Sequence, residues 1–307
     1  MTQISALGTA GDSTQDAPTS GLRAAGRPSK PKPKPKPKPK TTIGNGLRRI
    51  SFELRGYFRQ TDQVFFVFLF PLVMFALFAS IFSGETVVDD PRFADVTMSQ
   101  YYLTGMLAMA ILLSGMQFLG IDIATEKHEG GLARLGATPL SPVSFFIGKI
   151  GLVLLTCTVQ LALLMALAVI AFDITLPDSG ELWTRFAWLS ILGIFCFAAL
   201  GIAISAIPRS ARSASAIVLP LVLVPQFLSG IYVQFSVLPE WMQQVSNLFP
   251  LAGLVRGMRS VFLPDAFAAA EVGGTWGLGD AAITLGVWTV IGLVASLLTF
   301  RWSRGRN

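Results

Sequence analysis

The chain has 307 residues, of which 52% are hydrophobic and only 14% are charged, and its mean hydropathy is +0.59. Because soluble domains are about one quarter charged, this composition excludes an ordinary soluble globular protein. The formal net charge is +6, and residues 1–62 are polar and basic whereas long apolar runs dominate the rest. The chain is therefore predicted to be a polytopic membrane protein.

The N-terminal segment differs in composition from everything that follows. Residues 1–29 are rich in Ser, Thr, Gly, Ala and Pro, and residues 30–40 alternate strictly between Lys and Pro. We predict a disordered, basic, cytoplasmic tail over residues 1–43 and a transmembrane domain over residues 44–307. Alternating prolines favour a stiff extended rod, which either attaches to anionic membrane lipid or acts as a solubilising spacer. Nucleic-acid binding is not predicted, because no aromatic residue is interleaved for stacking.

A short amphipathic helix is predicted between the tail and the first apolar run. The sequence GLRRISFELRGYF, residues 46–58, carries apolar side chains at helical spacing, namely Leu47, Ile50, Leu54 and Phe58. Arginines occupy the other faces. A helix of this kind lies in the membrane interface.

Six apolar runs are long enough to cross a bilayer, at about 20 residues for a hydrocarbon core of about 30 Å. They are residues 64–83, 101–121, 145–171, 185–207, 214–233 and 281–300. Lipid offers no partner for open backbone groups, and no run alternates in polarity as a barrel strand does, so six helices and an all-α fold are predicted. We expect the first turns of the long third run to lie at the interface, with Lys149 extending to water.

The distribution of basic residues predicts the orientation. With the N-terminus inside, 20 of the 24 lysines and arginines lie on the cytoplasmic side, as the positive-inside rule requires. The protein is therefore expected in the plasma (inner) membrane, with both termini in the cytoplasm. The charged segment after the second run then becomes a cytoplasmic loop.

Two sets of residues are candidates for a transport function. Polar side chains within the spans either bond neighbouring helices or line a pathway, and the candidate lining residues are Ser114, Gln117, Gln160, Gln226 and Ser229. Between the last two spans, residues 240–247 and 251–261 are too short to cross and suit re-entrant or interfacial helices. Candidate residues in that segment are Trp241, Pro250, Arg256 and Arg259.

Catalytic chemistry is not predicted for this chain. It has no GxxxxGK[ST] phosphate loop, one histidine, and two cysteines that lie inside different spans. These residues form no credible zinc site or nucleophilic triad. We therefore expect no catalytic, metal or cofactor site.

Two segments carry a family resemblance. They are EKHEGGLARLGATPLSPVSFFIGK, residues 126–149, and FPLAGLVRGMRSVF, residues 249–262. Together with the six spans, the lead-in helix and the paired short helices, they resemble the type-2 ABC exporter permeases. The most similar branch is that of the daunorubicin-resistance permeases. The resemblance covers most of the chain after the Lys-Pro tract, and the doubled Gly130-Gly131 departs from that branch's pattern.

The resemblance implies partners and a coupling site. Such permeases pair two membrane subunits, identical or related, with two cytosolic ATPase subunits that bind ATP and Mg, so the missing phosphate loop is expected. The loop after the second span corresponds to the coupling helix that docks on the ATPase. Its residues here are Glu126, Glu129, Gly130, Gly131, Leu132, Arg134, Leu135 and Pro139, with Leu132 and Leu135 expected to present an apolar edge.

The function expected from these features is ATP-driven export of a hydrophobic or amphiphilic compound such as an antibiotic. Export of a lipid or a lipid-linked glycan by the same architecture remains open. An intramembrane enzyme is a less favoured alternative, because it would need reactive pairs of side chains and the spans hold almost no ionisable residues. A secondary transporter would usually carry buried acids or inverted repeats, and the sequence shows neither feature.

Overall fold

A computed structural model describes residues 42–61, 64–87, 96–136, 138, 141–271 and 273–299. The chain divides into two compact units, Met1–Pro39 and Lys40–Asn307, and all described residues belong to the second. The predicted tail therefore lies almost entirely outside the described residues.

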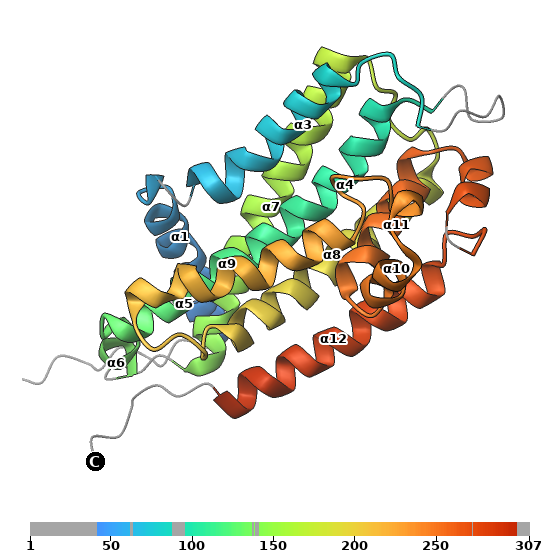
Figure 1. Cartoon of the computed structure of the whole chain (residues 1–307). Coiled ribbons are helices and arrows are strands. Elements are labelled where there is room, and N and C mark those ends of the chain that lie inside the picture. Colours follow the sequence, from blue (N-terminus) through green and yellow to red (C-terminus); the bar gives the residue numbers. More distant parts are fainter. Residues whose placement is uncertain are drawn as a thin grey trace, which may run out of the picture. The chain divides into compact units, whose positions relative to one another are not determined.

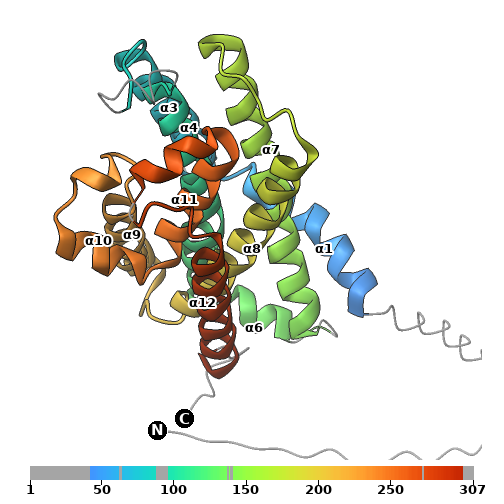
Figure 2. The same cartoon turned by 90° about the vertical axis from the view of Figure 1, so that its right-hand side faces the viewer.

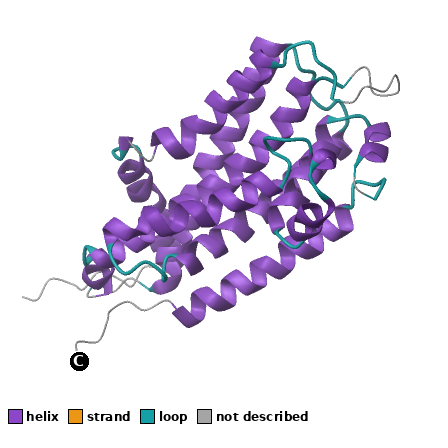
Figure 3. Cartoon of the chain, viewed as in Figure 1, coloured by secondary structure: helices purple, strands orange, loops and turns teal. Residues whose placement is uncertain are grey.

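The described part of the chain is helical and contains six helices that are long and apolar enough to span a membrane. Its only paired extended residues form one isolated bridge, between Thr86 and Thr97 (Figure 3). The prediction of an all-α protein with six spans is confirmed. The spanning helices are η1 with α3 (Val64–Leu69 and Phe70–Ile81), α4 with η3 and α5 (Met98–Leu112, Leu113–Phe118 and Leu119–His128), α7 (Pro142–Phe172), α8 (Gly180–Ile204), α9 (Ala211–Leu228) and α12 (Leu278–Thr299).

The second spanning helix differs most from its predicted bounds. It continues past Ile121 to His128, so Asp122 and Glu126 lie on a helix and not in a loop. Sequence reasoning ended the span at the first charge, since an unpaired carboxylate is costly in lipid. The partner that makes this extension possible comes from another helix, as described below.

Helix α4 forms the centre of the bundle. Every one of its residues except Gln100 is buried, and it packs against α3, α7, α8 and α11 (Figures 1 and 2). Its start is fixed by a capping box, in which the Thr97 side chain accepts from the Gln100 backbone N–H and the Gln100 side chain accepts from the Thr97 N–H. This helix is the scaffold on which the polar features of the other helices are placed.

Glycines let the neighbouring helices approach closely. A Cβ at Gly115 would lie 2.7 Å from the Phe197 Cβ, and one at Gly201 would overlap the Gly115 carbonyl oxygen. Helices η3 and α8 are therefore in near-backbone contact, as is common where small residues meet in a membrane. On the other side of α8, the Ser296 hydroxyl of α12 donates to the Ala199 carbonyl.

The lead-in helix α1 (Thr42–Tyr57) packs along α7. Glu53 and Tyr57 are buried, whereas Leu47 and Phe58 of the predicted apolar stripe are more than half exposed. Ile50 of the same stripe lies against Gly151 of α7, where a Cβ would overlap it, so only part of the stripe faces the protein. The outward face of α1 then combines apolar side chains with arginines, which suits a membrane interface.

Two short helices precede the last span at the end of the bundle opposite α6 (Gly131–Gly136) (Figure 1). They are α10 (Glu240–Asn247) and α11 (Pro250–Phe262), which confirms the predicted pair of short helices. Trp241 on α10 is exposed. Helix α11 starts at Pro250 and is buried except for Arg256, so it is part of the core. Its re-entrant character stays a prediction.

Candidate functional site

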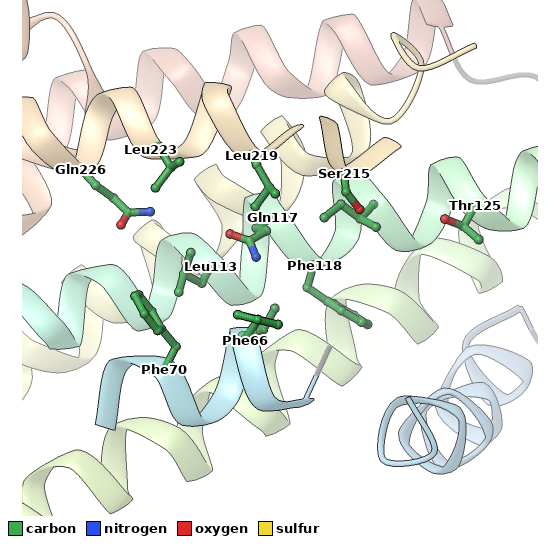
Figure 4. A pocket seen from close by; sticks show the side chains of 12 residues that line it. Phe66, Phe70, Leu113, Gln117, Phe118, Thr125, Ser215, Leu219, Leu223 and Gln226 are labelled. Carbon is green, nitrogen blue, oxygen red and sulfur yellow. The ribbon is translucent and has the colours of Figure 1, made fainter. Parts of the chain in front are cut away.

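A cavity of about 610 Å³ lies between the first, second and fifth spanning helices. Phe66 and Phe70 approach from one side, and Leu219, Leu223 and Gln226 of α9 from the other (Figure 4). None of its twelve lining residues is ionisable: they are Phe66, Val67, Phe70, Leu113, Gln117, Phe118, Ile121, Thr125, Ser215, Leu219, Leu223 and Gln226. Its volume lies in the range of drug-sized binding sites, and its chemistry suits an apolar or aromatic molecule with a few polar groups.

The structure separates the five predicted lining residues into two groups. Gln117 and Gln226 line the cavity. Ser114 and Gln160 lie behind its wall, where the Ser114 hydroxyl donates to Gln160 Oε1 at 3.1 Å. Ser229 is buried and donates to the Gln226 carbonyl. Only the two glutamines, Gln117 and Gln226, are therefore placed to contact a molecule in the cavity.

Tyr232 holds the Gln226 amide in place. The Tyr232 hydroxyl donates to Gln226 Oε1 at 2.7 Å, and burial raises the pKa of Tyr232 to about 12. The phenol is therefore protonated at physiological pH and remains a donor. Since the amide oxygen is engaged, the amide nitrogen is the group that Gln226 can offer to a ligand.

The predicted coupling segment forms a turn and a short helix at the end of α5. Helix α5 ends at His128 and α6 begins at Gly131. Between them Gly130 has φ of +77°, a left-handed conformation that glycine adopts without strain. Thr138 closes the segment by donating to the Leu135 carbonyl, and Pro139 lies outside the described residues.

The apolar residues of α6 face the chain itself. Leu132 is 2% exposed, and Leu135 is half-buried against the same hydrophobic cluster, so the prediction that Leu132 offers an apolar edge to a partner is wrong in this structure. A six-residue helix gives no sequence signal for which side is covered. The exposed side chains of the segment are those of Glu129, Ala133, Arg134 and Thr138.

The same segment is tied to the turn between α8 and α9. His128 Nε2 lies 2.9 Å from the Pro208 carbonyl oxygen, and Lys127 Nζ donates to the Ala206 carbonyl at 3.4 Å. Helix α9 forms one wall of the cavity. A displacement of α6 would therefore reach that wall through a short chain of direct contacts.

A buried ionic cluster joins α1, α5 and α7. Lys149 on α7 is 1% exposed, and its ammonium contacts Asp122 at 2.5 Å, Glu53 at 2.7 Å and Glu126 at 3.0 Å. Arg49 adds a second cation, 2.6 Å from Glu53. The expectation that Lys149 extends to water is therefore wrong. Glu126 contacts Lys149 through one carboxylate oxygen and is partly exposed, and its part in a coupling site stays a prediction.

The three carboxylates of this cluster would also suit a cation. Their oxygens lie within 4.8 Å of one another, but the Lys149 ammonium already contacts all three. An internal cation thus supplies the charge compensation that a metal ion would give. We assign the cluster a structural role in joining α1 and α5 to α7.

A second buried ion pair lies on α11. Arg259 is 2% exposed; its Nη1 donates to Glu271 at 2.8 Å and its Nη2 to the Gly230 carbonyl at 2.8 Å. The guanidinium also lies 4.1 Å from the Tyr101 ring centroid. Burial alone would lower the pKa of Arg259, but Glu271 and Tyr101 raise it above its usual value, so the group stays charged. Arg256, by contrast, bonds the exposed Asn247 side chain.

Comparison with known proteins places the chain in a family. Residues 86–301 match the family described as "ABC-2 family transporter protein", which is more than half of the chain. The chain belongs to the ABC-2 transporter family. It is therefore a membrane-embedded permease subunit of an ABC exporter that associates with an ABC ATPase and a permease partner. It is not itself catalytic, because the ATPase is a separate subunit.

Individual relatives of this ABC-2 permease are distant. It is 26% identical over 258 residues to the daunorubicin resistance ABC transporter permease protein DrrB1 of Streptomyces coeruleorubidus, covering 80% of this chain and 81% of the relative. It is 24% identical to the probable multidrug ABC transporter permease YbhR of Escherichia coli over 60% of this chain and 49% of YbhR. The putative transport permease YvfS of Bacillus subtilis is 25% identical over 64% of this chain and 77% of YvfS. The resemblance identified from the sequence is confirmed.

Proposed function

We propose that this ABC-2 permease exports a hydrophobic or amphiphilic compound, such as an antibiotic, through the cavity between η1, η3 and α9. The observation that carries the proposal is the lining of that cavity, which is aromatic and aliphatic with two amide groups, two hydroxyl-bearing residues and no charge. Phe66 and Leu223 on its walls are exposed at the surface, so a molecule dissolved in the bilayer could enter from the side. The relatives named for daunorubicin resistance and multidrug transport support the same class of substrate.

The working complex in this proposal contains two permease subunits, identical or related, and two ATPase subunits that bind ATP and Mg. The permease itself binds no cofactor. The permease lies in the plasma membrane with both termini in the cytoplasm. This orientation keeps 20 of its 24 lysines and arginines on the cytoplasmic side. The ATPase then docks against the exposed surface formed by Glu129 at the end of α5 and Arg134 on α6.

Reconstitution tests the proposal directly. The purified complex of permease and cognate ATPase, placed in liposomes, is expected to move daunorubicin in an ATP-dependent manner, read from the fluorescence of the drug. A fluorescent phospholipid serves as the second probe. Transport of the phospholipid without transport of daunorubicin would contradict drug export and favour lipid export. Transport of neither probe would contradict the proposed substrate class.

The docking surface makes a separate prediction. Exchanging the charges at this surface with Glu129→Lys and Arg134→Glu should reduce co-purification with the ATPase about twofold to thirtyfold, because exposed ion pairs typically contribute about 0.2–1 kcal/mol each. Leu132→Ala should instead lower the free energy of unfolding of the permease by about 2–5 kcal/mol, since that side chain is buried. Pull-down yields and melting curves distinguish the two effects. A charge exchange that leaves both co-purification and stimulated ATP hydrolysis unchanged would show that α6 is not the contact.

A further inference from the structure

Five of the eight residues by which the first two spans line the cavity lie on π-helical segments. Segment η1 supplies Phe66 and Val67, and segment η3 supplies Leu113, Gln117 and Phe118. The two segments also contact each other. A π-helical turn holds one more residue than an α-helical turn and is frequent at functional sites, so the cavity owes part of its shape to this local backbone geometry.

Pro71 gives a chemical reason for the irregular backbone of η1. In a continuous α-helix the Val67 carbonyl would accept from the N–H of residue 71. That residue is proline, which has no N–H and whose ring clashes with the carbonyl four positions earlier. The first span, Val64–Ile81, therefore has a backbone acceptor near its start that its own α-helical pattern cannot satisfy, and lipid offers no replacement.

Gln160 on α7 supplies the missing donor. Its Nε2 donates to the Val67 carbonyl at 3.0 Å and to the Phe68 carbonyl at 2.9 Å. Its Oε1 accepts from the Ser114 hydroxyl of η3 at 3.1 Å. The orientation of the amide follows from these partners, because two carbonyls can only be satisfied by the nitrogen. Gln160 is 0% exposed and lies behind the cavity wall.

We propose that Gln160 is a positioning residue for the transport site, which sets the shape of the cavity by holding η1 in its π-helical form and linking it to η3. Without Gln160, the carbonyls of Val67 and Phe68 lose their donor, and Pro71 still rules out an α-helical partner for Val67. Segment η1 then leaves its present geometry, and this movement displaces Phe65 and Phe66 relative to α3. The effect of Gln160 on specificity for the exported molecule rests on the proposed function. Its effect on the shape of the cavity does not.

The structural test measures distances between spin labels in a background free of Cys157 and Cys196, diluted with unlabelled protein. One pair joins Phe65 of η1 to Ile191 of α8, and a reference pair joins Leu77 of α3 to Ile191; all three side chains are exposed. Gln160→Met, which keeps the length of the side chain without its hydrogen bonds, should shift the first distance and leave the reference unchanged. Thr158→Val is the matched control, because Thr158 is exposed and bonds only within α7 at Leu154.

Pro71→Ala provides an independent variant, should Gln160→Met not fold. It restores the N–H at position 71, so that an α-helical hydrogen bond to the Val67 carbonyl becomes possible, and it should move the Phe65 label while Gln160 remains in place. The functional arm measures daunorubicin uptake by the reconstituted complex. Gln160→Met is expected to raise the half-saturating drug concentration about fivefold or more. ATP hydrolysis in the absence of drug, and the yield of purified complex, should be close to those of Thr158→Val.

The two arms separate two failures. A Phe65–Ile191 distance that stays unchanged in both Gln160→Met and Pro71→Ala overturns the positioning role. An unchanged half-saturating concentration, in a variant whose distance has shifted, likewise overturns it as a determinant of specificity. Absence of daunorubicin uptake in the parent complex counts against the proposed function alone, because the distance measurement still decides whether Gln160 shapes the cavity.

Discussion

Lys149→Met should lower the stability of this permease more than almost any other single substitution. It leaves the carboxylates of Glu53, Asp122 and Glu126 close together and without the ammonium that contacts all three. Removal of one partner from a buried ionic group costs about 3–5 kcal/mol, because the remaining charges stay desolvated and unpaired. A strong loss of folded protein in detergent, with a lower melting temperature, is expected.

Lys149→Arg and Glu129→Gln are the matched controls for this experiment. Arginine keeps the positive charge and can still donate to several carboxylates, so a part of the stability should return. Glu129 is exposed at the end of α5, and its neutralisation should change stability by less than about 0.5 kcal/mol. A Lys149→Met protein with the melting temperature of the parent would contradict the buried cluster.

Arg259→Met is expected to have the second largest effect. It removes the partner of Glu271, whose side chain is 4% exposed, and also the donor to the Gly230 carbonyl. The loss should again be about 3–5 kcal/mol, and should loosen α11 from α4 and from the segment before α12. Proteolysis or hydrogen exchange in that region, together with the melting temperature, measures it.

Arg256→Met tests whether the effect belongs to the buried guanidinium. Arg256 lies on the same helix and bonds Asn247 in an exposed setting, so its loss should cost about 1 kcal/mol or less. Arg259→Lys should be intermediate, because an ammonium cannot reproduce the flat contact with Tyr101 and both hydrogen bonds. Equal destabilisation by Arg256→Met and Arg259→Met would speak against a special role for the pair.

The spans and the short helices could be predicted from the sequence because they depend on local properties. Apolar length and the prolines at Pro239 and Pro250 act over a few residues. The bounds of α10 agree with the prediction to the residue. The polar residues of the spans were also found, although the sequence could not tell that Gln117 and Gln226 face a cavity while Ser114 and Gln160 face each other.

What could not be predicted depends on residues that are distant in the sequence. Lys149 pairs with Asp122, 27 positions earlier, and with Glu53, 96 positions earlier. A signal was present nevertheless: Glu53 is the only acid of α1 and Lys149 the only charge of the third span, and lone ionisable residues in apolar surroundings usually have partners. Glu271, the partner of Arg259, gave no such signal because it follows the helices in an irregular segment.

The face that a helix buries was the other source of error. On α1 the apolar stripe did not show that Glu53 and Tyr57 are buried, because a glycine on α7 decides how α1 sits. On α6 the sequence predicted that Leu132 forms part of an apolar docking edge, whereas its side chain is buried. In a membrane, both lipid and protein interior accept apolar side chains, so hydrophobic periodicity alone does not distinguish them.

Filling the cavity tests the central claim most directly. Leu219 and Leu221 lie on the same helix with similar exposure, 37% and 41%, but only Leu219 lines the cavity. In the reconstituted complex, Leu219→Trp is expected to abolish ATP-dependent daunorubicin transport while ATP hydrolysis without drug continues, and Leu221→Trp is expected to transport as the parent does. Equal transport by the two variants would contradict the assignment of this cavity as the path of the exported molecule.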